Sequence, residues 1–140
     1  MRNRRAFDGK ATAMYKLNPK VDTSGTDGLT LFEFPPVGLV ELFGEVCDSD
    51  GCKVSRKHVF TSDRGDVFTV YDWKQTTLYR GESSGAPTPE EFWRSRELKL
   101  LRIGGRVGSN PRPFLKWLQG EYELRAATHR ARHTADSECA

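Results

Sequence analysis

KVSRKHVFTSDRGDVFTVYDWK, residues 53–74, holds two runs of β-branched and aromatic side chains joined by a short polar link. Residues 67–71 read Val-Phe-Thr-Val-Tyr, which is typical of a strand. The link at residues 63–66 is Asp-Arg-Gly-Asp, and a Gly-containing link of about three to five residues is typical of a β-hairpin. The stretch therefore predicts an antiparallel hairpin, and with it a sheet, at the centre of the fold.

Further strands are expected on both sides of this hairpin. Residues 29–34 predict a short edge strand, because Pro35-Pro36 stops the pattern there. Residues 37–46 are predicted as a second strand, although their apolar side chains do not alternate cleanly. Residues 98–103 predict another strand, which the glycine pair at 104–105 ends.

Two helices are predicted in the C-terminal half. Thr88-Pro89-Glu90-Glu91 has the pattern of a capping box with proline at the first helical position, which predicts a short helix through Arg94. Asn110-Pro111 caps a final helix. Its apolar side chains are spaced for one helical face, which we expect to cover one face of the sheet: Phe114, Leu115, Trp117, Leu118 and Tyr122.

The chain of 140 residues is predicted to form one α+β domain over residues 29–124, with an antiparallel sheet of four to five strands. Residues 1–28 are expected to be a flexible basic arm, because they are polar and show no sustained hydrophobic period. Residues 125–140 are expected to be a flexible tail, because their side chains are mostly small and polar.

Charge is distributed unevenly along the chain. The formal net charge is +3, yet residues 1–20 carry six basic side chains and one acidic one. Residues 22–93 hold thirteen acidic and six basic side chains, whereas residues 94–116 hold seven basic and one acidic. A local excess of six positive charges predicts a binding surface for phosphate or an acidic partner. The alternative is a solvated basic face that balances the acidic half of the same fold.

The predicted binding surface combines this basic segment with a neighbouring tryptophan. Tryptophan and arginine often anchor partner interfaces, and aromatic rings among arginines also suit single-stranded nucleic acid. By contrast, Trp73 and Trp117 are expected in the core. The predicted binding residues are Trp93, Arg94, Arg96, Lys99, Arg102, Arg106, Arg112 and Lys116.

An alternative site lies in the opening stretch. Asp66 starts the second strand of the hairpin, and Asp72 and Lys74 follow its end. An acid on a hairpin followed by Asp-x-Lys matches the pattern of PD-(D/E)xK nucleases, in which two carboxylates hold Mg²⁺ and the lysine assists the water or the phosphate. The pattern is short and lacks the proline before the first acid. The competing interpretation is a surface Asp/Lys pair at the end of a strand.

The cysteines and the absence of a long apolar run argue against a secreted, zinc-binding or membrane protein. Cys47 and Cys52 bracket a turn and could pair, but nothing else indicates secretion, so free thiols are favoured. Two cysteines and a scattered His58 fall short of the roughly four ligands of a zinc site. No run is long enough to span a membrane. We expect an intracellular protein, cytoplasmic or nuclear, and the Arg-rich N-terminus also suits mitochondrial import.

Two short motifs carry a resemblance. Thr-Val-Tyr-Asp-Trp-Lys, within residues 67–74, is followed by Arg-Ile-Gly-Gly at 102–105 and by the closing helix. This combination resembles small uncharacterised α+β proteins of large DNA viruses and bacteriophages. The resemblance implies an accessory or interaction protein, and it attaches no activity, cofactor or catalytic residue to the chain.

The function favoured by the sequence is non-catalytic. We expect a small binding module that engages a protein or nucleic-acid partner through residues 94–116, assisted by the N-terminal arm. No small-molecule substrate, cofactor or membrane contact is expected. The alternative is a nuclease that uses Mg²⁺ at Asp66, Asp72 and Lys74.

Overall fold

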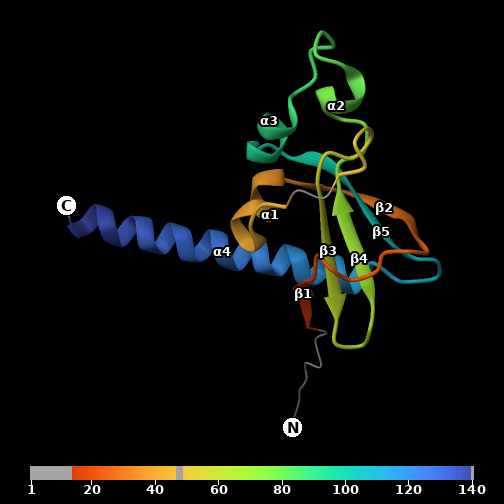
Figure 1. The fold of residues 1–140 in the computed structure, drawn as a ribbon. Helices are drawn as coiled ribbons and strands as arrows, with labels where there is room; N and C mark the ends of the chain where they lie inside the picture. Colours follow the sequence, from red (N-terminus) through yellow and green to blue (C-terminus); the bar gives the residue numbers. More distant parts are fainter. Residues whose placement is uncertain (1–13, 47–48, 140) are drawn as a thin grey trace.

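The computed structural model describes residues 14–46 and 49–139, and from residue 129 onward it describes the backbone alone. The part of the chain that it describes contains five strands and four helices (Figure 1). In chain order these are β1 (Tyr15–Leu17), β2 (Thr26–Phe34), α1 (Pro36–Phe43), β3 (Lys57–Ser62), β4 (Val67–Tyr71), α2 (Thr77–Arg80), α3 (Pro89–Arg94), β5 (Lys99–Arg106) and α4 (Arg112–Cys139).

The strands form one antiparallel sheet in the order β1-β3-β4-β5-β2. The predicted hairpin is confirmed as β3 and β4, with Phe60 opposite Phe68. Its turn places Gly65 at φ +88°, a left-handed conformation that favours glycine. The α+β fold with a five-stranded antiparallel sheet is therefore the one that the sequence predicts.

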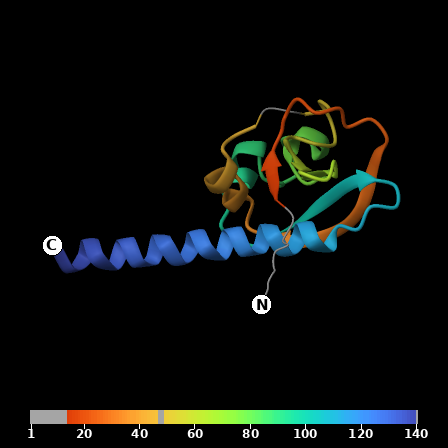
Figure 2. The ribbon, with the colours of Figure 1, turned by 90° about the horizontal axis from the view of Figure 1, so that it is seen from below.

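Helices α1 and α4 cover one face of the sheet, and an aromatic core fills the space between the layers. Phe68 on β4 stacks on Phe114 of α4 with ring centroids 5.1 Å apart, and Phe43 of α1 meets Phe60 edge-on at 4.8 Å. The N-terminal half of α4 lies against the domain, and its C-terminal half extends beyond the other elements (Figure 2). This layer confirms the prediction that the C-terminal helix covers the sheet.

The predicted strand over residues 37–46 is wrong, because this segment forms α1. Pro36 occupies the first turn of the helix, where a missing N–H costs nothing. Gly38 is buried, and a Cβ there would lie 2.7 Å from the ring of Tyr122 on α4. The glycine therefore permits close packing of α1 on α4.

The sheet extends past two of the predicted boundaries. Gly104 and Gly105 were expected to end a strand, but both lie inside β5. Residues 15–17 and 26–28 were placed in the flexible arm, yet they form β1 and the start of β2. The preceding residues 1–13 lie outside the described part. At the other end, residues 125–139 continue α4 where a flexible tail was expected.

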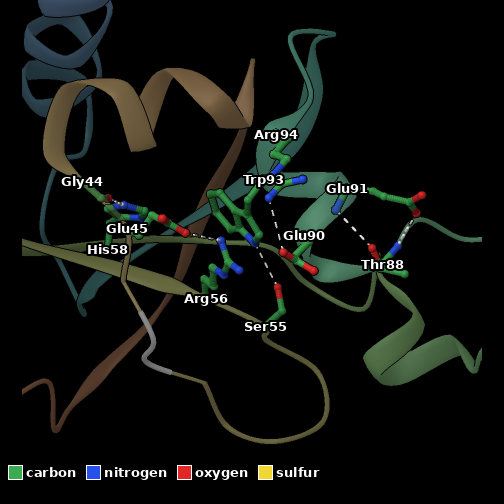
Figure 3. A network of polar contacts seen from close by, with 10 residues as sticks. All are labelled: Gly44, Glu45, Ser55, Arg56, His58, Thr88, Glu90, Glu91, Trp93 and Arg94. Carbon is green, nitrogen blue, oxygen red and sulfur yellow. Dashed lines mark hydrogen bonds and ion pairs between the residues drawn. The ribbon is translucent and has the colours of Figure 1, made fainter.

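The predicted capping box is confirmed at the start of α3. The Glu91 N–H donates to Thr88 Oγ1 at 3.1 Å, and the Thr88 N–H donates back to Glu91 Oε1 at 2.9 Å (Figure 3). The one-turn helix α2 directly precedes a segment rich in glycine and serine, residues 81–87. It begins where the Thr76 hydroxyl accepts from the Leu78 N–H.

Candidate basic-aromatic cavity on the open sheet face

A cavity of about 390 Å³ lies on the sheet face opposite α1 and α4. Side chains alternate along a strand, so Phe68 and Val70 of β4 enter the core whereas Thr69 and Tyr71 point to the cavity. Its lining comes from the start of β2, the loop before β3, strands β3 to β5 and Trp73. The lining residues are Thr26, Asp27, Gly28, Ser49, Asp50, Val54, Lys57, Thr69, Tyr71, Trp73, Arg102 and Gly104.

The cavity floor consists of two glycines that face each other across β2 and β5. A Cβ on Gly104 would come within 2.5 Å of Thr69 Oγ1. A Cβ on Gly28 would come within 3.1 Å of Arg102 Nη1 and within 3.7 Å of the Tyr71 hydroxyl. The bare backbone therefore makes room for the polar groups of Thr69, Tyr71 and Arg102 directly above the sheet.

Arg102 places a guanidinium group in this cavity. Its Nε is buried and has no hydrogen-bond partner. Within residues 14–46 and 49–128, Arg102 forms no ion pair with a carboxylate. Its guanidinium carbon instead lies 4.9 Å from the centroid of the Trp73 ring, a cation–π contact. A guanidinium has five N–H donors and cannot accept, so Arg102 presents donors that the protein leaves unused.

Tyr71 stands beside Arg102 on the neighbouring strand, since the two residues are register partners. Burial raises the pKa of the Tyr71 phenol, Arg102 opposes that shift, and the carboxylate of Asp27 adds to it. The phenol is therefore a neutral hydroxyl at neutral pH, able both to donate and to accept a hydrogen bond. Its ring meets Trp73 edge-on at 6.3 Å.

The ring of Trp73 makes cation–π contacts with side chains from three separate segments of the chain. Besides Arg102 on β5, Lys74 Nζ lies 5.4 Å from the indole centroid and Lys53 Nζ lies 5.8 Å from it. Lys74 also approaches the ring of Tyr79, whose side chain is 45% exposed, at 5.2 Å. We call Lys53, Trp73, Lys74, Tyr79 and Arg102 the basic-aromatic cluster.

Two carboxylates border the cavity. Asp27 Oδ1 accepts from the Gly28 N–H at 2.9 Å. Asp50 Oδ1 accepts from the backbone N–H groups of Cys52, Lys53 and Val54 at 2.8 to 2.9 Å. Desolvation acts to raise the pKa of Asp50, but these donors outweigh it and lower the pKa.

The residues predicted for a nuclease do not meet. Asp66 and Asp72 lie at opposite ends of β4, about 20 Å apart at the usual rise of a strand. Two carboxylates that share one Mg²⁺ must both reach within about 2.1 Å of the ion. Nor does the described part of the chain contain any group of three His, Cys, Asp or Glu side chains able to hold a metal. Asp66, Asp72 and Lys74 therefore do not fit a Mg²⁺ site.

Asp72 has a structural environment. It is fully buried and accepts hydrogen bonds from the Ser55 hydroxyl at 2.7 Å, the Ser55 N–H at 3.0 Å and the Arg56 N–H at 3.1 Å. Burial raises the pKa of the Asp72 carboxyl, and the hydrogen bonds from Ser55 and Arg56 oppose that shift. The Asp66 carboxylate accepts a hydrogen bond from the Ser62 hydroxyl at 3.1 Å, next to the hairpin turn.

Trp93, the predicted aromatic anchor, lies in the core and is only 1% exposed. Its indole N–H donates to the Ser55 hydroxyl at 3.0 Å (Figure 3), and its ring lies 5.7 Å from that of His58. A partner at the surface cannot contact this ring. Trp73 was expected in the core. It instead lines the cavity.

The predicted basic residues scatter over the surface. Arg94 pairs with Glu90, Arg96 with Glu41 and Lys99 with Glu97. These pairs partly neutralise the charge excess that the sequence shows. Arg106 donates to the Gly65 carbonyl at 3.2 Å, and Arg112 and Lys116 lie exposed on the first turns of α4. Only Arg102 of the eight predicted residues lines the cavity.

No family model matches the chain, and no curated protein matches it at a significant level. In the part of the chain that the structure describes, no helix has the length and apolar character needed to cross a bilayer. Cys52 is exposed and free, whereas Cys47, its predicted alternative partner, lies outside the described residues.

Proposed function

We propose that this protein is a non-catalytic module that binds single-stranded nucleic acid through the open face of its sheet. One observation carries the proposal: three cationic side chains from three segments of the chain surround the partly exposed Trp73. Positively charged grooves with aromatic platforms bind single strands, because the cations follow the phosphates while the bases stack on the rings.

The composition of the cluster favours nucleic acid over a protein partner. A protein interface is expected to have an apolar centre with a charged rim. Here the charged groups Lys74 and Arg102 lie against the central ring itself, at 5.4 and 4.9 Å. The N-terminal arm, with its excess of positive charge, would add contacts to phosphates outside the cavity.

The test is the affinity of the full chain for fluorescein-labelled nonathymidylate, dT9, measured by fluorescence anisotropy over a range of salt concentrations. Trp73→Leu is expected to weaken binding roughly tenfold, since a stacked base contributes about 1–3 kcal/mol. The double variant Lys53→Gln/Lys74→Gln is expected to reduce the slope of log K against log salt by about 1.4, at about 0.7 for each phosphate contact of a single strand.

Arg112→Gln/Lys116→Gln is the matched control, because it removes two exposed cations from α4, outside the basic-aromatic cluster. We expect it to change affinity much less than the Lys53/Lys74 double variant. Absence of dT9 binding at low salt would reject the proposal and leave a protein partner. Cleavage of the strand on addition of Mg²⁺, lost in Asp66→Ala, would contradict the non-catalytic role.

A further inference from the structure

The cavity that Trp73 and Arg102 of the basic-aromatic cluster line has room for part of the bound strand, if the proposed function holds. Arg102 extends over the glycine floor with a buried, unpartnered Nε. A polar donor removed from water without an acceptor destabilises the protein. An acceptor supplied by a ligand would offset that cost, so the cavity favours a ligand with an acceptor edge facing Arg102.

The rest of the lining makes a phosphate an unsuitable occupant. Asp27 and Asp50 border the same cavity as Arg102 and Lys57, so the negative charges of a phosphate would face two carboxylates. Asp27 acts on the cavity interior, because its charge contributes to the raised pKa of Tyr71. The lining thus offers both donors and acceptors, which suits a neutral planar group that also carries both.

The shape of the cavity points the same way. Gly28 and Gly104 leave a flat stretch of backbone, and the aromatic side chains of Tyr71 and Trp73 lie beside it. A volume of about 390 Å³ lies in the range of small-ligand sites. It is large enough for one nucleobase removed from its stack, the form in which bases of single strands are read by proteins.

We infer that the cavity receives one guanine base of the bound strand, with O6 and N7 facing the Arg102 guanidinium and a base N–H donor facing the Asp27 carboxylate. Guanine is the base that presents two adjacent acceptors, O6 and N7, to an arginine. Adenine offers N7 beside an amino group, which would oppose the guanidinium donors. The pyrimidines have no N7.

The experiment compares three strands with the unmodified full chain: dT9, the same strand with a central guanine, and the same strand with a central 7-deazaguanine. 7-Deazaguanine keeps the shape of guanine and lacks the N7 acceptor. The guanine strand is expected to bind about tenfold more tightly than dT9, and the 7-deaza substitution is expected to remove most of that gain. No variant protein is needed, so misfolding cannot confuse the result.

A second arm uses Arg102→Lys, which keeps the charge but loses the planar pair of donors. It is expected to abolish the preference for guanine, measured as the ratio of the affinities for the guanine strand and for dT9. Arg106→Lys, on the same strand and outside the cavity lining, is the control and should retain the preference. Equal affinity for all three strands would overturn the guanine site while the proposed function stands. Failure to bind any strand would overturn both.

Discussion

The two faces of the sheet are built from the same strands with different chemistry. On β4, Phe68 and Val70 enter a dry aromatic core, whereas Thr69 and Tyr71 between and beside them line a polar cavity. On β5, Leu101 and Ile103 are fully buried, and Arg102 and Gly104 face the cavity. The comparison indicates that one face holds the fold together while the other is available for a ligand.

The difference between the two faces should be largest when one residue on each face of β4 is substituted and the losses of unfolding free energy are compared. Phe68→Ala removes a ring that stacks on Phe114 and should lower the free energy of unfolding by about 3–5 kcal/mol. Thr69→Ala, at the next position, should cost about 1 kcal/mol, because it removes only a methyl and a hydroxyl group. Urea denaturation followed by circular dichroism measures both. Equal losses would contradict the division of roles between the faces.

The next effect concerns the two acids at the ends of β4. Asp72→Ala leaves the Ser55 hydroxyl and the Ser55 and Arg56 N–H groups without their acceptor in the interior, so we expect a loss of about 3 kcal/mol. Asp66→Ala is the matched control at the partly buried hairpin end and should cost less than about 1 kcal/mol, because it removes one hydrogen bond from the Ser62 hydroxyl. Urea denaturation of the two variants side by side tests this, and a smaller loss for Asp72→Ala than for Asp66→Ala would argue against its structural role.

The core face should also respond to pH through His58. Its Nε2–H donates to the Gly44 carbonyl at 3.1 Å, its Nδ1 is buried without a partner, and burial lowers the pKa of His58 to about 4. The ordinary pKa in the unfolded chain is about 6.5. The unfolded state therefore binds more protons between these values, and stability should fall as the pH drops from about 6.5 to about 4, by up to about 3 kcal/mol.

The raised pKa of Asp72 acts in the opposite direction over the acid range, so the His58 effect must be isolated. His58→Gln keeps an N–H donor that can reach Gly44 and does not titrate. The difference in unfolding free energy between the two proteins, followed by urea titration from pH 4 to 7, should change with pH by nearly the whole His58 contribution. A constant difference would show that His58 is not held neutral by the core.

The sequence predicts the strands whose side chains alternate between apolar and polar, and the helix whose N-terminus has a capping box. The β3–β4 hairpin follows from its alternating strand and glycine turn, and α3 follows from Thr88 and Glu91. Helix α1 was missed although Leu39, Val40 and Phe43 follow Pro36 at helical spacing, because its two valines and Gly38 favour a strand or a break over a helix. The packing of the helix depends on contact of Gly38 with Tyr122, which is distant in the chain. Position in the sequence alone does not reveal such contacts.

The site was predictable only in part. The charge pattern identified Arg102 as a binding residue, but it also included basic residues that lie elsewhere on the surface. Three of these form ion pairs with Glu41, Glu90 and Glu97, which the sequence does not reveal. Alternation along β4 would have placed Trp73 on the face of Thr69 and Tyr71. The glycines at 28 and 104 gave no signal, because their role depends on the register between β2 and β5.

The most direct test of the open face as the binding surface is a titration of ¹⁵N-labelled full-length protein with dT9, followed by chemical-shift changes of the assigned amides and the indole N–H groups. We predict the largest changes at the indole N–H of Trp73 and at the amides of Thr69, Tyr71, Arg102 and Gly104, with little change at Arg112 and Lys116. Changes centred on the first turns of α4, with none around Trp73, would contradict the account.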